Sequence, residues 1–316
     1  MTQHYQIGDV RVSRIEELMG PMFDPVRFFP SFDPSLFDQH ASWLYPNHAE
    51  RESGRIVASM HSWLIDTGTT KILVDTCLGN HKDRQPYRDW DHLDTPWLSR
   101  LHAAGARPED IDYVLCTHLH VDHVGWNTQL KDGSWIPTFP NARYLFCQAE
   151  LDHLVAELAD LDEEDTFGQV NAKTFEDSIK PILSQAELID HDQALADTGA
   201  ELMLTPGHTP GSMSLRLSCT EKPVYFTGDV CHHPLQMLVP EMNSAYCQQP
   251  DVAIATRRSL LSRCEQEGAL LLPAHFGTPH GCQVREEEAS FIPIWKAMEG
   301  RINAPPHQKD HSTFER

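Results

Sequence analysis

The sequence contains no apolar run long enough to span a bilayer. It begins with a polar stretch, MTQHYQIGDVRVSRIEE, in which no apolar core precedes a small-residue cleavage site. We therefore expect neither a secretory signal nor a membrane partner, and we predict a cytoplasmic protein. Hydrophobic residues make up 40% and charged residues 22% of the chain, which is ordinary for a globular protein.

Basic residues are also scarce. The chain has 25 Lys and Arg against 46 Asp and Glu, a formal net charge of −21, and no segment gathers its basic residues into a cluster. A surface this acidic repels phosphate backbones, so we expect no nucleic-acid partner. Arg257 and Arg258 are adjacent, but they are explained most simply as exposed helix residues.

Cysteine pairs of the CxxC kind are absent. The 8 cysteines are scattered along the chain, which predicts free thiols in a cytosolic protein. The same scatter argues against a cysteine-rich structural zinc site. Repeats and low-complexity segments are missing as well, and 316 residues fit one large domain or two small ones.

Apolar, partly β-branched runs are frequent from residue 61 onward. Runs such as HSWLIDTG, KILVDTCLG, DYVLCT and PVYFTGDV predict strands, and TPWLSRLHAAG and IATRRSLLSRCEQEG predict helices. ALLLPAHF is predicted as a final strand, with a helix over 285–298 after it. The polar segment DEEDTFGQVNAKTF is expected to be exposed, with a helix following it. This mixture predicts an α/β fold with layered sheets rather than a purely parallel sheet.

The predicted organisation is a single domain over residues 1–302 with a flexible tail over 303–316. We expect a loop-rich N-terminal lobe over about residues 1–55. In it, a short strand near residues 10–15 precedes FDPVRFFPSFDPSLFDQH, a stretch rich in Phe and Pro without a clear period. This lobe would cover the rest of the domain as a lid or pack irregularly against its core.

One short segment, CTHLHVDHVGWN, carries His118, His120, Asp122 and His123 directly after a predicted strand. If the extended geometry continues, the first three share a face, whereas His123 points elsewhere and Gly125 lets the chain turn. The loop then presents two imidazoles to one point, and a carboxylate and an imidazole to a neighbouring point. These ligands suit zinc, iron or manganese, and two metals use such a set more easily than one.

Three further candidate ligands each follow an apolar run. They are His208 in LTPGHTPGS, Asp229 in YFTGDV and His275 in LLPAHFG, and each has Gly or Pro beside it. Taken singly, each is explained equally well as a turn or capping residue. Their shared strand-to-loop placement predicts instead that all three belong to one site.

These motifs together resemble the metallo-β-lactamase superfamily. H-x-H-x-D-H, G-H-T-P-G-S, T-G-D and a late strand-end histidine carry the resemblance, which covers about residues 55–285. It implies an αββα four-layer sandwich with two metals at the edge between its sheets. By this resemblance, Asp229 bridges a first metal held by His118, His120 and His208 and a second held by Asp122, His123 and His275.

The resemblance implies a metal-dependent hydrolase with two zinc ions, although the same ligands accept iron or manganese. Two metals can hold a bridging hydroxide near neutral pH and polarise a substrate oxygen. We predict that this hydroxide opens a lactone or cleaves a related ester in a small-molecule substrate. Asp122 and Asp229 favour the hydrolase side of the superfamily and are candidate catalytic residues.

Within the superfamily, the layout is most similar to the acyl-homoserine lactonase and methyl parathion hydrolase branch, for which a homodimer is plausible. Lactonases of this branch place a tyrosine three residues after the bridging aspartate. Here that position is His232, in GDVCHHP. We predict that His232 donates a hydrogen bond or a proton to the leaving oxygen, with His233 as its rival and loop packing as the alternative.

Other residues near the motifs have less definite roles. Asp75, in ILVDTCLG, matches the aspartate that supports the ligand loop in this family, and a turn residue is its alternative. Cys231 is expected to be a pocket or core thiol, and His280 a surface histidine. An apolar substrate wall, or simple packing, is expected from Trp126, Phe23, Phe28, Phe29 and Phe32.

Other functions remain open at this point. Phosphotriester hydrolysis needs the same ligands, and thioester hydrolysis of the glyoxalase kind would also need a basic pocket, which the sequence does not indicate. An iron-dependent redox protein of this superfamily usually carries a flavin domain, for which there is no motif. The acidity disfavours a nuclease, and a non-catalytic metal-binding protein would be favoured only if a ligand were missing.

Overall fold

The computed structural model describes residues 3–162 and 164–295. Within these residues, two seven-stranded sheets and a small two-stranded sheet form the strand framework. The first sheet has the order β1 (Gln3–Ile7), β2 (Val10–Phe23), β3 (Ile56–Asp66), β4 (Lys71–Val74), β5 (Tyr113–Leu115), β8 (Arg143–Cys147) and β9 (Ala186–Ile189). The second has the order β10 (Gln193–Leu195), β11 (Ala200–Leu204), β12 (Met213–Leu217), β13 (Val224–Phe226), β14 (Leu270–Leu272), β15 (Cys282–Glu287) and β16 (Ser290–Ile294).

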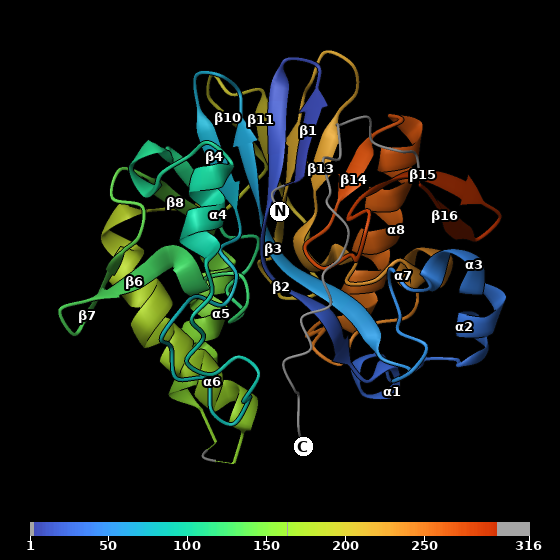
Figure 1. The fold of residues 1–316 in the computed structure, drawn as a ribbon, viewed down its shortest axis with the longest axis horizontal. Coiled ribbons are helices and arrows are strands. Elements are labelled where there is room, and N and C mark those ends of the chain that lie inside the picture. The colour runs from blue at the N-terminus through green and yellow to red at the C-terminus, as the bar shows by residue number, and fades with distance from the viewer. Residues whose placement is uncertain (1–2, 163, 296–316) are drawn as a thin grey trace.

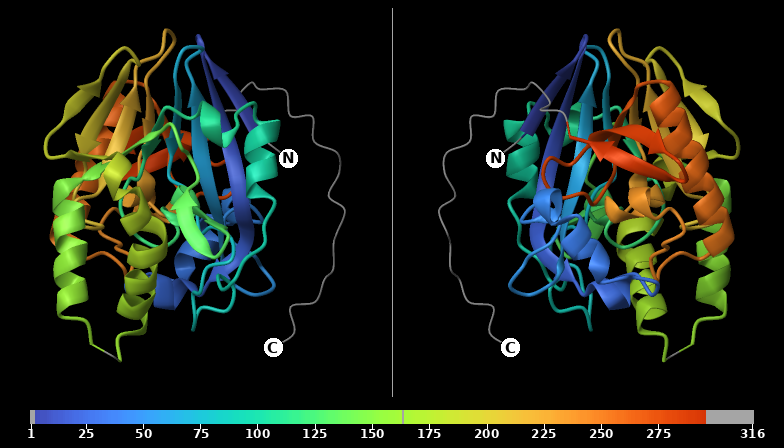
Figure 2. Two further views of the ribbon diagram at one scale, coloured as in Figure 1. Left: turned by 90° about the vertical axis from the view of Figure 1, so that its left-hand side faces the viewer. Right: turned by 90° about the vertical axis from the view of Figure 1, so that its right-hand side faces the viewer.

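The two large sheets pack face to face, with helices on their outer faces (Figures 1 and 2). Apolar side chains from both sheets, such as Val12 and Phe226, form one buried cluster between them. Helices α4 (Trp97–Ala103) and α5 (Gln148–Ala159) cover the first sheet, and α8 (Pro250–Gln266) covers the second. This arrangement confirms the predicted αββα sandwich.

Shorter elements lie in the connections between the strands and helices of these layers. Strands β6 and β7 form a separate hairpin, and α6 lies within the polar segment that we expected to be merely exposed. Outside the N-terminal lobe, these shorter elements are β6 (Thr128–Lys131), β7 (Ser134–Pro137), α6 (Thr166–Thr174), α7 (Leu235–Leu238), the π-helix η3 (Phe175–Ile179), and the 3₁₀ turns η1 (Pro108–Asp110), η2 (Gly125–Asn127), η4 (Lys180–Gln185) and η5 (Gly228–Val230).

The N-terminal region is more regular than the sequence suggested. The strand expected near residues 10–15 is the 14-residue β2, which pairs with β1 and β3 inside the first sheet. Only the segment after β2 forms a separate lobe, because its Phe and Leu side chains build their own apolar cluster with α7. The lobe consists of α1 (Pro25–Phe28), α2 (Ser35–Gln39) and α3 (Ala41–Leu44).

The prediction of a helix over 285–298 is wrong for the part of it that the structure describes. Strands β15 and β16 form an antiparallel hairpin there, so β14 is not the final strand. The charged run favoured a helix, but Val284 and Phe291 are buried against α8 and its sheet, and Glu288 makes the turn with φ of 53°. The tail predicted over 303–316 lies outside the described residues.

Strand direction brings the candidate ligands to one edge of the sandwich. β4 and β5 are parallel neighbours in the first sheet, and β13 and β14 are parallel neighbours in the second. The carboxyl ends of parallel strands meet at the same edge of a sheet. Every candidate ligand follows one of β5, β11, β13 or β14 in the chain.

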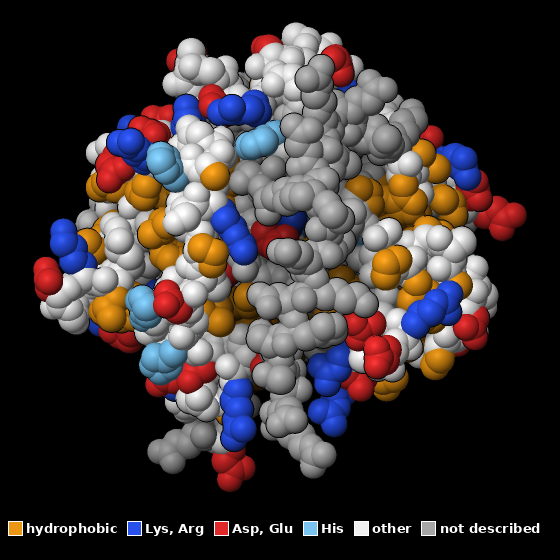
Figure 3. All heavy atoms as spheres, in the orientation of Figure 1, with side chains coloured by type: hydrophobic (Ala, Val, Ile, Leu, Met, Phe, Trp, Pro, Cys, Tyr) orange, Lys and Arg blue, Asp and Glu red, His pale blue; other side chains and the backbone are white. Residues whose placement is uncertain are grey.

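Several structural features bear on the expectations from composition. Within the described ranges, no helix has the length and apolarity needed to cross a membrane. On the face shown in Figure 3, Lys and Arg side chains are scattered among Asp and Glu. All 8 cysteines are free thiols, as predicted. Arg257, expected to be exposed, is instead buried and donates hydrogen bonds to the carbonyl oxygens of Val230 and Pro240.

Candidate metal centre

Asp75 fastens the histidine-rich loop to the end of β4. It follows β4 directly, with φ of 58°, and its side chain is buried. Oδ1 accepts a hydrogen bond from the backbone N–H of Thr117 at 2.7 Å, and Oδ2 accepts one from the Thr117 hydroxyl at 2.9 Å. Oδ2 also lies 2.9 Å from Nδ1 of His123. These contacts agree with the supporting role that the resemblance implied.

The loop after β5 reaches the predicted arrangement by a different route. The extended geometry does not continue past Thr117, because residues 117–124 form bends and a turn. His118 and His120 nevertheless converge, with Nε2 of the first 3.0 Å from Nδ1 of the second. Asp122 does not join them and instead lies with His123 and His275. The turn thus separates the loop's four side chains into two pairs.

The three distant candidates reach the same place from the second sheet. His208 lies in the loop between β11 and β12, Asp229 in η5 after β13, and His275 in the loop after β14. Each is buried, with 4% to 7% of its surface exposed. All seven predicted ligand residues therefore belong to one cluster, which sequence spacing alone could not show.

The first group of donors comprises His118, His120, His208 and one oxygen of Asp229. Nδ1 of His120 lies 3.0 Å from Nε2 of His208, and Oδ2 of Asp229 lies 3.4 Å from that same nitrogen and 3.8 Å from Nε2 of His118. Ligands bound tetrahedrally at about 2.0–2.2 Å from one zinc ion lie about 3.3–3.6 Å from one another. The distances between the donor atoms of the first group are therefore close to those expected for ligands of one shared cation.

The second group comprises Asp122, His123, His275 and the other oxygen of Asp229. Nε2 of His275 lies 3.1 Å from Oδ1 of Asp229 and 3.6 Å from Oδ2 of Asp122. Nε2 of His123 lies 3.7 Å from Oδ1 of Asp122. Oδ1 of Asp229 thus faces the second group, while Oδ2 faces the first and also lies 3.5 Å from Nε2 of His123. Asp229 therefore lies between the two groups, as a bridging carboxylate would.

The orientation of two imidazoles tests whether a metal fits. Nδ1 of His275 lies 3.2 Å from the carbonyl oxygen of Ser59, which can only accept, so Nδ1 carries the proton of the neutral ring. His123 directs its own Nδ1 at Asp75 in the same way. When both rings are neutral, the two Nε2 atoms therefore present lone pairs to each other at 3.3 Å, a repulsion that a proton or a cation between them relieves. A bound cation removes this repulsion, so the residues fit a metal ion.

The electric field at the cluster also favours positive charge. Burial opposes the charged form of His123, but the three surrounding carboxylates outweigh it and raise the pKa of this imidazole well above its usual value. Burial similarly opposes the ionised form of Asp229, yet the nearby imidazoles hold the pKa of this carboxyl well below its usual value. A site that would hold a proton this tightly can hold a divalent cation instead.

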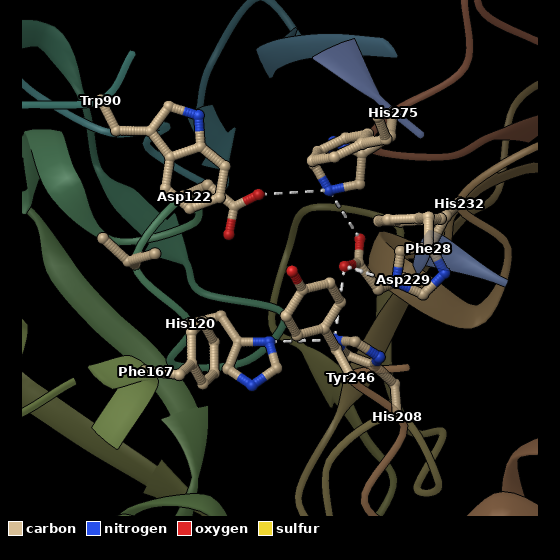
Figure 4. Close-up of a pocket in the computed structure, with 12 residues that line it drawn as sticks. Phe28, Trp90, His120, Asp122, Phe167, His208, Asp229, His232, Tyr246 and His275 are labelled. Carbon is tan, nitrogen blue, oxygen red and sulfur yellow. Dashed lines mark hydrogen bonds and ion pairs between the residues drawn. The ribbon is translucent and has the colours of Figure 1, made fainter. Parts of the chain in front are cut away.

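A pocket with largely aromatic walls opens above the cluster (Figure 4). Phe167 comes from α6 and packs 5.5 Å from the His120 ring and 5.3 Å from the Tyr246 ring, measured between centroids. Figure 4 shows the Tyr246 hydroxyl directed into the pocket, toward the side on which Asp122 lies. No Lys or Arg occurs among the described residues that line this pocket: Phe23, Phe28, Trp90, His120, Val121, Asp122, Phe167, His208, Asp229, His232, Tyr246 and His275.

The structure separates the two adjacent histidines whose roles were open. His232 lines the pocket, and its Nε2 lies 3.1 Å from Oδ2 of Asp229. Neither of its ring nitrogens makes a hydrogen bond within the described part of the chain. His233 points away, with Nε2 donating to the carbonyl oxygen of His48 and Nδ1 accepting from the N–H of Leu235. His233 therefore packs the loop.

Several expectations about the pocket surroundings need correction. His280 is buried, not a surface residue, and Nδ1 donates to the carbonyl oxygen of Phe276. Trp126 is buried outside the pocket, where its N–H donates to Glu17 at 2.6 Å. Phe23 and Phe28 do line the pocket, whereas Phe29 and Phe32 pack in the N-terminal lobe. Cys231 is in the core, as one of its two expected places.

Sequence reasoning missed three of the aromatic wall residues. Trp90 lies in the long connection between β4 and α4, Phe167 at the start of α6 and Tyr246 in the connection between α7 and α8. No motif or apolar period marks them in the sequence. Phe167 lies in a segment that was expected to be exposed. The three side chains reach the pocket only because their segments fold over the cluster.

Comparison with known proteins adds an independent finding. A sequence profile of the metallo-beta-lactamase superfamily matches residues 58–275. Curated relatives include an N-acyl homoserine lactonase from Bacillus cereus, 32% identical over 122 residues, which are 39% of this chain and 38% of the relative. Another is the N-acyl homoserine lactonase AttM from Rhizobium radiobacter, 26% identical over 139 residues, which are 43% of this chain and 47% of the relative. The matches thus span less than half the length of these relatives.

Solved structures match over nearly the whole chain. The hydrolase AbOPH of the β-lactamase superfamily superposes with a TM-score of 0.75 at 25% identity, covering 93% of this chain and 98% of its own. AidC, a dizinc quorum-quenching lactonase solved with a product, has a TM-score of 0.75 at 19% identity, covering 94% of this chain and 97% of its own. The second likeness, at this low identity, concerns the fold alone.

Proposed function

The chain belongs to the metallo-beta-lactamase superfamily, as its sequence predicted, and we propose that it is a dinuclear metal-dependent hydrolase of lactones or related esters. One observation carries this proposal above the others. Two donor groups, bridged by the two oxygens of Asp229, lie beneath a pocket whose walls are aromatic. The relatives named N-acyl homoserine lactonase support the same activity.

The chain's own residues define what a bound metal pair could do here. When bound, two divalent ions would supply a hydroxide nucleophile near neutral pH and polarise the substrate carbonyl. Asp229 would contact both ions, because it lies between the groups with Oδ2 near His208 and Oδ1 near His275. The second group can be reached from the pocket at Asp122. The side chain of Asp122 is 15% exposed, whereas those of His123 and His275 are 1% and 6% exposed.

Two further side chains can reach a leaving oxygen. His232 is the stronger candidate because its ring nitrogens have no other hydrogen-bond partner within the described residues, and Nε2 already faces the bridging carboxylate. A protonated imidazole there would give its proton to the alkoxide released from an ester or lactone. Tyr246 is the second candidate, because its hydroxyl is directed into the same space.

The pocket walls favour a neutral substrate. Among the described residues that line the pocket, every one that is not a candidate ligand is apolar or aromatic, apart from His232 and the Tyr246 hydroxyl. An anionic substrate would find no cationic side chain there. This disfavours a glutathione thioester, which brings carboxylates, and leaves lactones, neutral esters and phosphotriesters. Among them we propose lactones and carboxylic esters, with phosphotriesters as the alternative.

Zinc is the metal we propose for both groups. Five imidazoles and two carboxylates form a donor set that zinc accepts in catalytic sites, although iron and manganese bind similar sets. An iron-dependent redox protein is therefore the alternative of a different class. We further propose that the substrate is a small molecule and that neither nucleic acid nor a membrane is a partner, in keeping with the net charge of −21. A cytoplasmic location and a homodimer stay predictions.

The proposal is tested by metal analysis and a substrate screen. Protein purified without added metal should contain close to two zinc ions per chain by elemental mass spectrometry. It should then hydrolyse members of a panel of lactones, aryl esters and phosphotriesters, and a chelator should abolish this turnover. Iron as the main metal, with turnover of oxygen or a persulfide, would establish the redox alternative. A chain that takes up no metal on titration would overturn the proposal.

A further inference from the structure

Glu150 is a buried carboxylate that belongs to neither donor group. It lies in the first turn of α5 and is 3% exposed. Its two oxygens point to two different segments of the chain. Oε1 accepts a hydrogen bond from the backbone N–H of Leu119, and Oε2 accepts one from the backbone N–H of Gly211, both at 3.0 Å.

These two segments are the loops that carry the first donor group. Leu119 lies between His118 and His120 in the loop after β5. Gly211 lies in the loop between β11 and β12, three residues after His208. The loops come from different sheets of the sandwich, since β5 belongs to the first sheet and β11 to the second. One carboxylate therefore joins the two halves of the fold at this group.

The contact between the helix and the second loop is close. A Cβ atom on Gly211 would lie 2.4 Å from the backbone nitrogen of Glu150 and 2.6 Å from its Cβ. These distances are far inside ordinary van der Waals contact, so only glycine fits without movement. The loop is also held internally, because the N–H of Thr209 donates to Oγ of Ser212 at 3.1 Å. The start of α5 thus sets where the His208 loop can lie.

Both hydrogen bonds need an acceptor with two oxygens. A carboxylate can accept from two N–H groups at once, and charge-assisted bonds of this kind are stronger than neutral ones. A glutamine would present an NH₂ group to one of the two N–H donors and lose that bond. An apolar side chain would leave both buried N–H groups without a partner.

We propose that Glu150 is a positioning residue that holds the His118–His120 loop against the His208 loop and so preforms the first metal-binding group. The second group should depend on it much less, because Asp75 holds the His123 ring and the carbonyl oxygen of Ser59 holds the His275 ring. This inference rests on the metal binding of the proposed function but not on its substrate. Partners that orient metal ligands typically contribute 10- to 100-fold to metal affinity, about the effect expected here.

The test is zinc binding by the full chain after metal removal, measured with a competing chelator dye. Wild type should bind two zinc ions tightly, whereas Glu150→Gln should keep one tight site and lose about 10- to 100-fold in affinity at the other. Asp152→Asn, an exposed carboxylate on the same helix, is the matched control and should bind as wild type does. Circular dichroism of each variant checks that the chain is folded.

Two variants that each lack one metal site show which site Glu150→Gln weakens. In a His275→Ala background the remaining tight site is the first group, and adding Glu150→Gln should weaken it by the full factor. In a His208→Ala background the remaining tight site is the second group, and the same change should have little effect. Cobalt provides a spectroscopic check, because the visible absorption of the ion in the first group should change in Glu150→Gln while that of the second persists.

A purely structural role would give a different result. It would lower the melting temperature of the metal-free and zinc-loaded protein equally, whereas the proposal requires a smaller zinc-induced increase in Glu150→Gln. If Glu150→Gln does not fold, Gly211→Ala displaces the same loop and should weaken the same site. Folded variants that bind both metals like wild type, or lose both equally, overturn this inference alone. A wild type that binds no zinc overturns the proposed function instead.

Discussion

Oδ2 of Asp75 lies 2.9 Å from Nδ1 of His123, on the side of the ring that faces away from the metal-binding groups. The contact fixes which nitrogen carries the proton and directs the lone pair of Nε2 toward Asp122, His275 and Asp229. The same oxygen accepts from the Thr117 hydroxyl, so the orientation of the ring is coupled to the position of the loop. Asp75, which belongs to neither donor group, thereby determines the ring orientation and the protonated nitrogen of the candidate ligand His123.

Asp75→Asn should weaken metal binding at the second group by about 10- to 100-fold. Asparagine tolerates the positive φ of this position, so the backbone should keep its path. The neutral amide, however, is a weaker acceptor for His123 and adds donors where none are needed. Zinc titration with the chelator dye measures the change. Two sites of wild-type affinity in a folded Asp75→Asn protein would show that this contact does not matter for binding.

His232→Phe should lower kcat about 100-fold or more on the best substrate, because general acid catalysis typically contributes 10²–10⁴-fold. Phenylalanine fills the space beside Phe28, which packs on the His232 ring with centroids 5.4 Å apart. Metal content should remain unchanged, and elemental analysis of the same sample establishes that. A variant that keeps its metals and loses no turnover on any substrate would remove His232 from the mechanism.

Tyr246→Phe is the comparison that separates the two proton-donor candidates. It deletes one hydroxyl and keeps the packing against Phe167. If His232 protonates the leaving oxygen, this variant should lose only about fivefold in kcat, the loss expected for one hydrogen bond of roughly 1 kcal/mol. A larger loss than that of His232→Phe would transfer the donor role to Tyr246.

Phe167→Ala should raise KM for substrates with long acyl or aryl groups and change kcat little. The ring forms part of the pocket wall, and its truncation removes apolar contact area that substrate and transition state use alike. The expected loss in kcat/KM is about tenfold or more for the longest chains and small for the shortest. Steady-state kinetics across an acyl-chain series measures it. An equal effect on all chain lengths would place the acyl group elsewhere.

The convergence of the candidate ligands could be predicted because the sequence places them by a rule of strand direction. His118, His208, Asp229 and His275 each follow an apolar run, and the ends of those runs meet at one edge of the sandwich. The reason given for the histidine-rich loop was nevertheless incorrect in part. It predicted an extended face shared by Asp122, but the turn over residues 121–123 assigns that carboxylate to the other group.

The pocket walls and the C-terminal hairpin could not be predicted, for a common physical reason. Trp90 and Tyr246 lie in connections whose paths depend on what they pack against, and Tyr87, which packs on Trp90 at 5.4 Å between centroids, shows such a contact. The hairpin of β15 and β16 depends on the pairing of β15 with β14. The helical preference of the residues within the hairpin carries no information about that pairing. Local propensity is a weak signal where tertiary contacts decide the structure.

His280→Asn should make the protein less sensitive to acid. Burial, assisted by Arg14, lowers the pKa of His280 to about 3, whereas in the unfolded chain this imidazole should have its ordinary pKa of 6.5. Between these pH values the unfolded state binds a proton that the folded state does not. The contribution of neutral His280 to the unfolding free energy is therefore complete above about pH 6.5 and is lost as the pH falls toward 3.

Asparagine suits this position because its side-chain N–H can still donate to the carbonyl oxygen of Phe276 and it tolerates the φ of 72°. From pH 7.5 to pH 5, wild type should lose about 2 kcal/mol more unfolding free energy than His280→Asn. Urea unfolding of the metal-stripped proteins at the two pH values gives this difference, independent of any constant loss from the substitution. Parallel losses in the two proteins would mean that His280 accepts a proton in the folded state, and that its burial does not contribute to the acid sensitivity of the fold.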